Sequence, residues 1–145
     1  MRIAVSTDTR EGVADALVSR LEADGHSVLR FGAFDASARA DWAWGSEAAA
    51  RAVASGAADQ GVVCCWTGTG ASIAANKVPG VRAALCGDPE TAAGARKWND
   101  ANVLALSLRL VSEPMLGEIL TAWFSSEPSD DPDDAANVAH VDQIA

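Results

Sequence analysis

A thiol and a glycine-rich turn stand side by side in the segment CWTGTGASIAANK, residues 65–77. The preceding residues, QGVVC, form an apolar run typical of a buried strand, and a helical pattern follows the glycines. We therefore expect Cys65 to end a strand, with Gly68 and Gly70 letting backbone N–H groups converge on an anion at a helix start. Such donors would also stabilise a thiolate. The alternative is that Cys65 is a small buried hydrophobic residue.

The neighbouring thiols and the turn itself carry weaker signals. Cys64 should point to the other face of the sheet, because side chains alternate along a strand, and both Cys64 and Cys86 are predicted to be buried. The turn is not a dinucleotide fingerprint, since Gly68 and Gly70 lack a third glycine in register, and it is not a P-loop, since no Gly-Lys-Ser/Thr follows.

The elements that must position this turn follow a regular alternation. Five apolar runs each precede a helical pattern, and they are RIAVS, SVLRF, GVVCC, RAALC and NVLAL. This alternation predicts parallel strands joined by right-handed helical crossovers, and hence a doubly wound, three-layer Rossmann-like α/β fold with a five-stranded parallel sheet. The first helix is the best defined, because Val13, Leu17, Val18 and Leu21 share one face and Gly25 provides a stop.

Ligands of open α/β sheets bind at the carboxyl ends of the strands, which directs attention to the residues there. Asp8 follows the first strand, and a helix cap is the alternative role for it. The other candidates are Asp41 with Trp42, the segment from Cys65 to Ser72, Gly87 with Asp88, and KWNDAN (97–102) before the fifth strand. Asn99, Asp100 and Asn102 could instead be turn residues.

The length and composition exclude several classes of protein. A chain of 145 residues makes about one domain, and a net charge of −9 disfavours nucleic acid and anionic lipid as partners. No apolar run approaches the length of a membrane span, and the N-terminus lacks a secretory signal, so a cytoplasmic protein is expected. The three cysteines form neither a disulfide framework nor a C-x-x-C motif, so no metal is expected.

The composition changes near residue 127. We predict an α/β domain over 1–126 and, over 127–145, an acidic linker followed by a C-terminal segment. In AANVAHVDQIA a short helix would place Val138, Val141 and Ile144 on one side. That side must dock on something, either a subunit interface or its own domain.

Together these segments resemble the family of ribose-5-phosphate isomerase B and galactose-6-phosphate isomerase. The resemblance is carried by AVASGAADQGVVCCWTGTGASIAANKVPGVRAALCGDPETA and by NDANVLALSLRLV, with weaker support from MRIAVSTD, Asp41 and Trp42. It implies a five-stranded parallel sheet, a homodimer or homotetramer with sites between subunits, and no cofactor. It also implies interconversion of aldose and ketose phosphates through an enediolate.

The resemblance also implies roles for individual residues. Cys65 corresponds to the catalytic base, and the turn from Thr67 through Gly68 and Gly70 to Ser72 corresponds to the anion-stabilising loop, with Thr67 counted as catalytic. Asp8 corresponds to a substrate contact and Asn99 to a hydroxyl-binding position.

Several positions depart from the family pattern. Thr9 and Trp98 replace histidines, Trp66 replaces a glycine, and Ala136 and His140 stand roughly where arginines would hold phosphate. The tryptophans predict a narrower pocket with faces for a ring or for apolar carbons.

The prediction is therefore an isomerase that uses Cys65 on a polyhydroxy or sugar-like substrate other than ordinary pentose phosphate, with activity on ribose 5-phosphate uncertain. Thr9, Asp41, Trp42, Trp66 and Trp98 are included among its substrate-binding residues. One alternative is a noncatalytic binding subunit or the inert half of a heteromeric isomerase. A further alternative is a standard ribose-5-phosphate isomerase.

Overall fold

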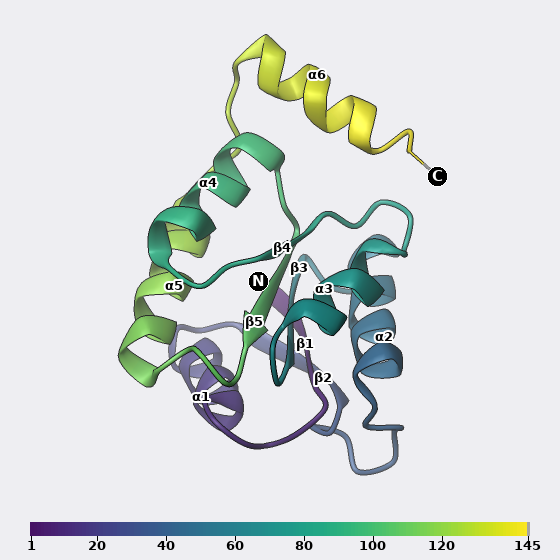
Figure 1. Cartoon of the computed structure of the whole chain (residues 1–145), viewed down its shortest axis with the longest axis vertical. Coiled ribbons are helices and arrows are strands. Elements are labelled where there is room, and N and C mark those ends of the chain that lie inside the picture. The colour runs from purple at the N-terminus through teal and green to yellow at the C-terminus, as the bar shows by residue number, and fades with distance from the viewer. Residues whose placement is uncertain (145) are drawn as a thin grey trace.

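The computed structural model describes residues 1–144, which form five strands and six helices in strict alternation until the last helix (Figure 1). In chain order they are β1 (Arg2–Thr7), α1 (Ala14–Ala23), β2 (Ser27–Gly32), α2 (Trp42–Ala54), β3 (Gln60–Cys65), α3 (Thr69–Asn76), β4 (Ala83–Leu85), α4 (Pro89–Asn99), β5 (Val103–Ser107), α5 (Glu113–Ser125) and α6 (Pro132–Val141).

The five strands form one parallel sheet in the order β2-β1-β3-β5-β4, which confirms the predicted fold class. The register pairs Ser6 with Val63 between β1 and β3, and Cys65 with Ser107 between β3 and β5. Continued by two residues, the first register sets Asp8 beside Cys65. The candidate residues at the carboxyl ends of these two strands therefore lie side by side.

Helices cover both faces of the sheet, and the two cores differ in composition. The core under α1, α4 and α5 holds large side chains such as Leu17, Ile119 and Trp123. The core under α2 and α3 is built largely from alanine and valine, with Ala49 and Ala71 fully buried. Small side chains let these two helices approach the sheet closely. The apolar face predicted for the first helix is buried in the core that holds the large side chains.

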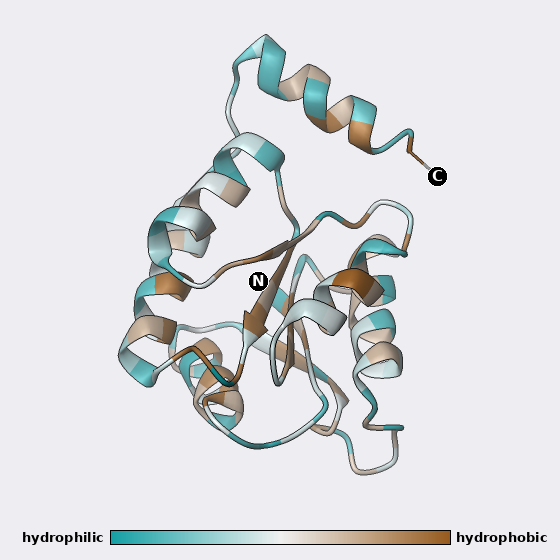
Figure 2. Cartoon of the chain, in the orientation of Figure 1, coloured by the Kyte–Doolittle hydropathy of each residue, from teal (hydrophilic) through white to brown (hydrophobic). Residues whose placement is uncertain are grey.

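The C-terminal helix α6 lies apart from the sheet beside the end of α4, and none of its residues is buried (Figure 1). It begins at Pro132, three residues before the predicted segment, because the Asp131 side chain accepts a hydrogen bond from the N–H of Asp133 (2.8 Å) and proline suits a first helical turn. Hydrophobic colour runs along β5 in Figure 2, whereas α6 mixes hydrophilic and hydrophobic residues.

None of the helices formed by residues 1–144 has both the length and the apolar character needed to cross a membrane.

Candidate active site

The turn after β3 depends on one glycine. Gly68 has φ +76°, a backbone conformation that favours glycine, and an added Cβ would lie 2.9 Å from the Ser107 nitrogen and 2.6 Å from Leu85 Cδ1. The turn therefore passes directly against β5 and β4. Any other residue at position 68 would push it away from the sheet.

The same turn is hydrogen-bonded to the chain that leaves β5. The Leu108 N–H donates to the Cys65 carbonyl (3.1 Å), and the Trp66 carbonyl accepts from the Arg109 N–H (2.9 Å) and the Ser107 hydroxyl (3.1 Å). These bonds fix the backbone on both sides of the cysteine. The start of the turn is therefore fixed to the segment at the carboxyl end of β5.

A surface depression of about 310 Å³ opens over this turn. Its walls bring together residues from the ends of β1 and β3 and the starts of α2 and α3, namely Asp8, Trp42, Cys65, Trp66, Thr67, Thr69 and Gly70. Neither lysine nor arginine is among them. Six of these seven residues were named individually as candidates from the sequence, and Thr69 was included only within the segment from Cys65 to Ser72.

The start of α3 faces this depression with free backbone donors. The first bond of the helix runs from the Ser72 N–H to the Gly68 carbonyl (3.0 Å), so the N–H groups of Thr69, Gly70 and Ala71 have no partner within the helix. A developing negative charge next to Cys65 would meet these donors and the positive end of the helix dipole.

Asp8 brings a carboxyl group to the same walls. Loss of water on burial raises the pKa of Asp8 above its usual value, the nearby carboxylates of Asp41 and Glu11 add to the rise, and the N–H groups of Asp8 and Thr9 oppose it. Its Oδ1 atom is buried without a hydrogen-bond partner. Such a group can hold a proton or take a hydrogen bond from a ligand, so the helix-cap alternative explains less of its environment.

Trp42 forms a wall of the depression by lying on a glycine. A Cβ on Gly70 would sit 2.9 to 3.2 Å from three atoms of the Trp42 ring. The indole is still 44% exposed, and that of Trp66 is 48% exposed. Two aromatic side chains therefore present accessible surface in the depression that also contains Cys65.

Four predicted residues lie outside the walls of the depression. The Asp41 carboxylate pairs with Arg39, and the Thr9 hydroxyl accepts the Glu11 N–H (3.4 Å). Gly68 shapes the turn, and Ser72 lies within α3. None of the four lines the depression. Asp88, also at a strand end, caps α4 by accepting hydrogen bonds from the Thr91 N–H and hydroxyl.

Trp98 and Asn99 lie at the amino ends of the strands, because they precede β5. Cys65 is the last residue of β3 and therefore lies at the opposite, carboxyl ends. A strand as long as β5 spans about 13 Å. Trp98 folds back onto Gly94, where an added Cβ would be 2.7 Å from its ring. A single chain thus does not bring these two residues to the cysteine.

They line instead a second cavity of about 250 Å³, here called the tail pocket, between the sheet edge and α6. Its walls are formed by Asn76, Arg82, Ala83, Ala84, Trp98, Asn99, Ala101, Asn137, Val138 and Val141.

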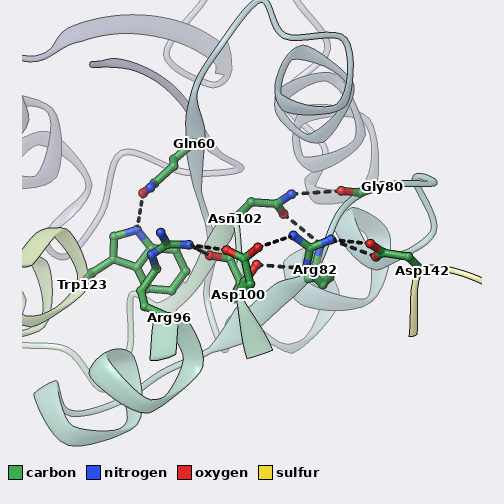
Figure 3. Close-up of polar contacts among 9 residues, drawn as sticks. Gln60, Gly80, Arg82, Arg96, Asp100, Asn102, Trp123 and Asp142 are labelled. Atoms are coloured by element: carbon green, nitrogen blue, oxygen red, sulfur yellow. Dashed lines mark hydrogen bonds and ion pairs between the residues drawn. The ribbon is translucent and has the colours of Figure 1, made fainter. Parts of the chain in front are cut away.

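An ionic network anchors the tail beside this pocket (Figure 3). Arg82 donates to the Asp142 carboxylate (2.8 Å) and to the Asp100 carboxylate (3.3 Å), and the Asn102 side chain accepts the Arg82 N–H (2.8 Å). Asp100 has φ +43° and ends α4. Asp100 and Asn102 are therefore structural turn residues, which the sequence had left open.

Arg109 is a further residue that the sequence analysis did not single out. Its backbone N–H donates to the Trp66 carbonyl, the residue is exposed, and its side chain forms no ion pair within residues 1–144. Its position two residues after the fifth strand was the available signal. The same part of the chain contains no group of three or more His, Cys, Asp or Glu residues that could hold a metal ion.

Comparison with known proteins agrees with this geometry. A sequence profile described as Ribose/Galactose Isomerase matches residues 3–143. Ribose-5-phosphate isomerase B of Escherichia coli is 39% identical over 111 residues, which cover 77% of this chain and 74% of that protein. Galactose-6-phosphate isomerase subunit LacB of Clostridium acetobutylicum is 35% identical over 124 residues, or 86% of this chain and 71% of that one.

A solved structure is similar over almost the whole chain. Clostridium thermocellum ribose-5-phosphate isomerase B superposes with a TM-score of 0.89 at 35% identity, covering 99% of this chain and 96% of the other. The similarity thus includes the sheet, the turn after β3 and the tail.

Proposed function

The chain belongs to the ribose/galactose isomerase family, and from that premise we propose that it interconverts an aldose and a ketose with Cys65 as the carbon base. The observation that carries the proposal is the depression in which the Cys65 thiol, the Asp8 carboxyl and the start of α3 meet. Proton transfer next to a carbonyl needs a base at the carbon and donors at the oxygen. These groups supply both.

The proposed reaction moves one proton between neighbouring carbons. The Cys65 thiolate takes the proton from the carbon beside the carbonyl, the C–H electron pair forms the C=C bond, and the carbonyl oxygen becomes an enediolate oxyanion. The N–H groups of Thr69 and Gly70, together with the Thr67 hydroxyl, stabilise that charge. The thiol then returns the proton to the adjacent carbon, and a hydroxyl proton moves to the other oxygen.

Asp8 is proposed to handle the oxygen-bound proton. Burial raises its pKa, which keeps the protonated form available at higher pH than for an exposed aspartate. Asp8 lines the wall where a substrate hydroxyl would bind. A carboxyl group in this state can both give and accept a proton as the two substrate oxygens exchange roles.

A second copy of the chain is proposed to complete the site. Trp98 and Asn99 cannot approach Cys65 of their own chain, and the C-terminal tail leaves Val141 49% exposed and Ile144 65% exposed. Docking of the tail region against the Cys65 depression of another subunit would cover this apolar surface and bring both halves together. We therefore propose a homodimer or a larger homo-oligomer.

The proposed substrate is a polyhydroxy carbonyl compound that does not depend on a phosphate group. A phosphate dianion is normally held by charge-assisted donors, whereas the depression has no Lys or Arg in its walls and the Arg82 guanidinium of the tail pocket is already paired with two carboxylates. The exposed indoles of Trp42 and Trp66 offer faces for the carbon side of a sugar.

The test is deuterium incorporation followed by proton NMR in D₂O. Tetroses, pentoses and hexoses would be offered with and without a terminal phosphate. We expect exchange at the carbon next to the carbonyl with at least one unphosphorylated sugar, and slow turnover of ribose 5-phosphate. Efficient turnover of ribose 5-phosphate would overturn the substrate class. No exchange with any sugar would favour a noncatalytic subunit.

A further inference from the structure

Two hydroxyl groups in the glycine turn are hydrogen-bonded to each other at the mouth of the depression. The Thr67 and Thr69 Oγ1 atoms are 2.8 Å apart, the usual distance for an O–H···O bond, and either oxygen can be the donor. Within residues 1–144 neither hydroxyl has a second hydrogen-bond partner. Both residues line the wall that also holds Cys65.

The spacing of this pair is imposed by the backbone. Gly68 lies between the two threonines with φ +76°, and contacts with β5 leave no room for a Cβ there. Thr69 is the first residue of α3, whose later turns are packed on the sheet through Ala71 and Ala75. The two side chains therefore face each other because the turn and the helix are both fixed.

The number of protons that the two hydroxyl groups can donate determines which direction of their hydrogen bond is useful. Each threonine hydroxyl has one proton to donate and can accept as well. If Thr67 donates to Thr69, it has no proton left for a substrate oxygen. If Thr69 donates to Thr67, the Thr67 proton is free to point into the depression, and the bond it accepts strengthens the one it donates.

We propose that Thr69 is a positioning residue that holds the Thr67 hydroxyl in the orientation that donates to the substrate oxyanion. This rests on the proposed function, because it assigns a role in the same isomerisation step. The neutral pair permits either direction, whereas a growing negative charge on the substrate oxygen favours the outward-pointing Thr67 proton. The hydrogen bond from Thr67 therefore stabilises the enediolate-forming transition state more than it stabilises the bound substrate.

The first test compares Thr69→Val, which keeps the shape and removes the hydroxyl, with Thr69→Ser, which keeps the hydroxyl. The rate of deuterium exchange at saturating sugar should fall about 10-fold in Thr69→Val with KM nearly unchanged, a smaller loss than the ~10²-fold expected when a direct oxyanion donor is removed. Thr69→Ser should retain wild-type exchange. Thr67→Val/Thr69→Val should be no slower than Thr67→Val alone, since Thr69 acts only through Thr67.

A second measurement does not depend on turnover. Three-bond NMR couplings to the Thr67 γ-methyl group report its χ1 rotamer, which should be single in the wild type and in Thr69→Ser but averaged in Thr69→Val. Wild-type exchange in Thr69→Val, additive losses in the double variant, or a Thr67 rotamer unchanged by Thr69→Val would each overturn the proposal while leaving the proposed function intact. Absence of exchange by the wild type would overturn the proposed function and the catalytic role of the pair together.

Discussion

Cys64 and Cys65 are consecutive in the chain, yet their thiols lie in different cores on opposite faces of the sheet. Cys64 packs with the large side chains under α1 and α5, and burial raises its pKa far above that of a free thiol. Cys65 packs with Ala71 and Ala105 and also reaches the wall of the depression. Each thiol is therefore a matched control for the other.

Replacing Cys65 should remove the chemistry and leave the fold. Cys65→Ser is expected to lower deuterium exchange by roughly 10²- to 10⁴-fold, the contribution of a positioned base, with a smaller loss of stability than Cys64→Ser because Cys65 borders the depression. Cys64→Ser should keep exchange but lose about 1–3 kcal/mol of stability, because a hydroxyl would be buried among apolar side chains. The reverse assignment of the two effects would exclude Cys65 as the base.

Alkylation should follow the same distinction between the three thiols. At pH 8 iodoacetamide should modify Cys65 first, since its sulfur borders the depression, whereas burial raises the pKa of Cys86 to about 11 and leaves little thiolate there. Mass spectrometry of partially modified protein measures the order. Modification of Cys86 before Cys65 would contradict the prediction, and denatured protein, in which all three react, serves as the control.

Asp8 should make stability depend on pH. Because its pKa is raised in the folded protein, the folded state binds more protons than the unfolded chain once the pH exceeds the ordinary value of 3.8. Its contribution to the free energy of unfolding should fall as the pH rises from there through the folded pKa. Asp8→Asn should be more stable than wild type at pH 7 and should lose this part of the pH dependence in urea titrations between pH 4 and 8. A variant with the wild-type profile would contradict this origin.

The contact between Trp42 and Gly70 should behave as a packed pair. Gly70→Ala is expected to cost about 1–3 kcal/mol, since its methyl group would collide with the indole. Most of that cost should disappear in a Trp42→Ala background, as a double-mutant cycle would measure. Gly87→Ala is the control, because a Cβ there meets nothing within 4 Å. Equal costs of Gly70→Ala in both backgrounds would mean that the indole is not what fills this space.

Assembly can be tested through the exposed face of α6. The wild type should sediment as a dimer or larger oligomer at micromolar concentration, and Val141→Asp should weaken association at least ~10-fold, since it places a charge in the proposed interface. Ala136→Asp, on the other side of the helix, should have little effect. A monomeric wild type would count against the shared site.

The sequence was sufficient for the fold because its signals are local. The β-branched runs and the helical face of Val13, Leu17 and Leu21 each follow from neighbours in the chain. The predicted fourth strand was RAALC, but only Ala83–Leu85 pair with β5. The flanking residues still bond to β5 through their backbones, since the Arg82 carbonyl accepts the Val103 N–H (3.3 Å) and the Cys86 N–H donates to the Ala105 carbonyl (3.1 Å). The Arg82 side chain pairs with Asp100 and Asp142, and no local sequence pattern encodes these tertiary contacts.

The site was predictable where it follows from strand ends and not where it follows from packing. Asp8 and Cys65 meet because their strands are parallel neighbours. Asn99 was grouped with them although residues before a strand lie at its amino end, a separation that the sequence order already contained. The contact of Trp42 with Gly70 requires the packing of α2 against α3. The hydrogen bond between Thr67 and Thr69 requires the αL conformation of Gly68.

The distribution of the five tryptophans gives the protein built-in fluorescent reporters. Trp123 is fully buried and donates to the Gln60 side chain (2.7 Å), whereas Trp42 and Trp66 flank the Cys65 depression and Trp98 borders the tail pocket, each about half exposed. Trp123 should emit at short wavelength as an internal reference for folding. The exposed indoles should emit further to the red, where occupation of the depression and association of subunits would each change the spectrum, and single Trp→Phe replacements would separate the two signals.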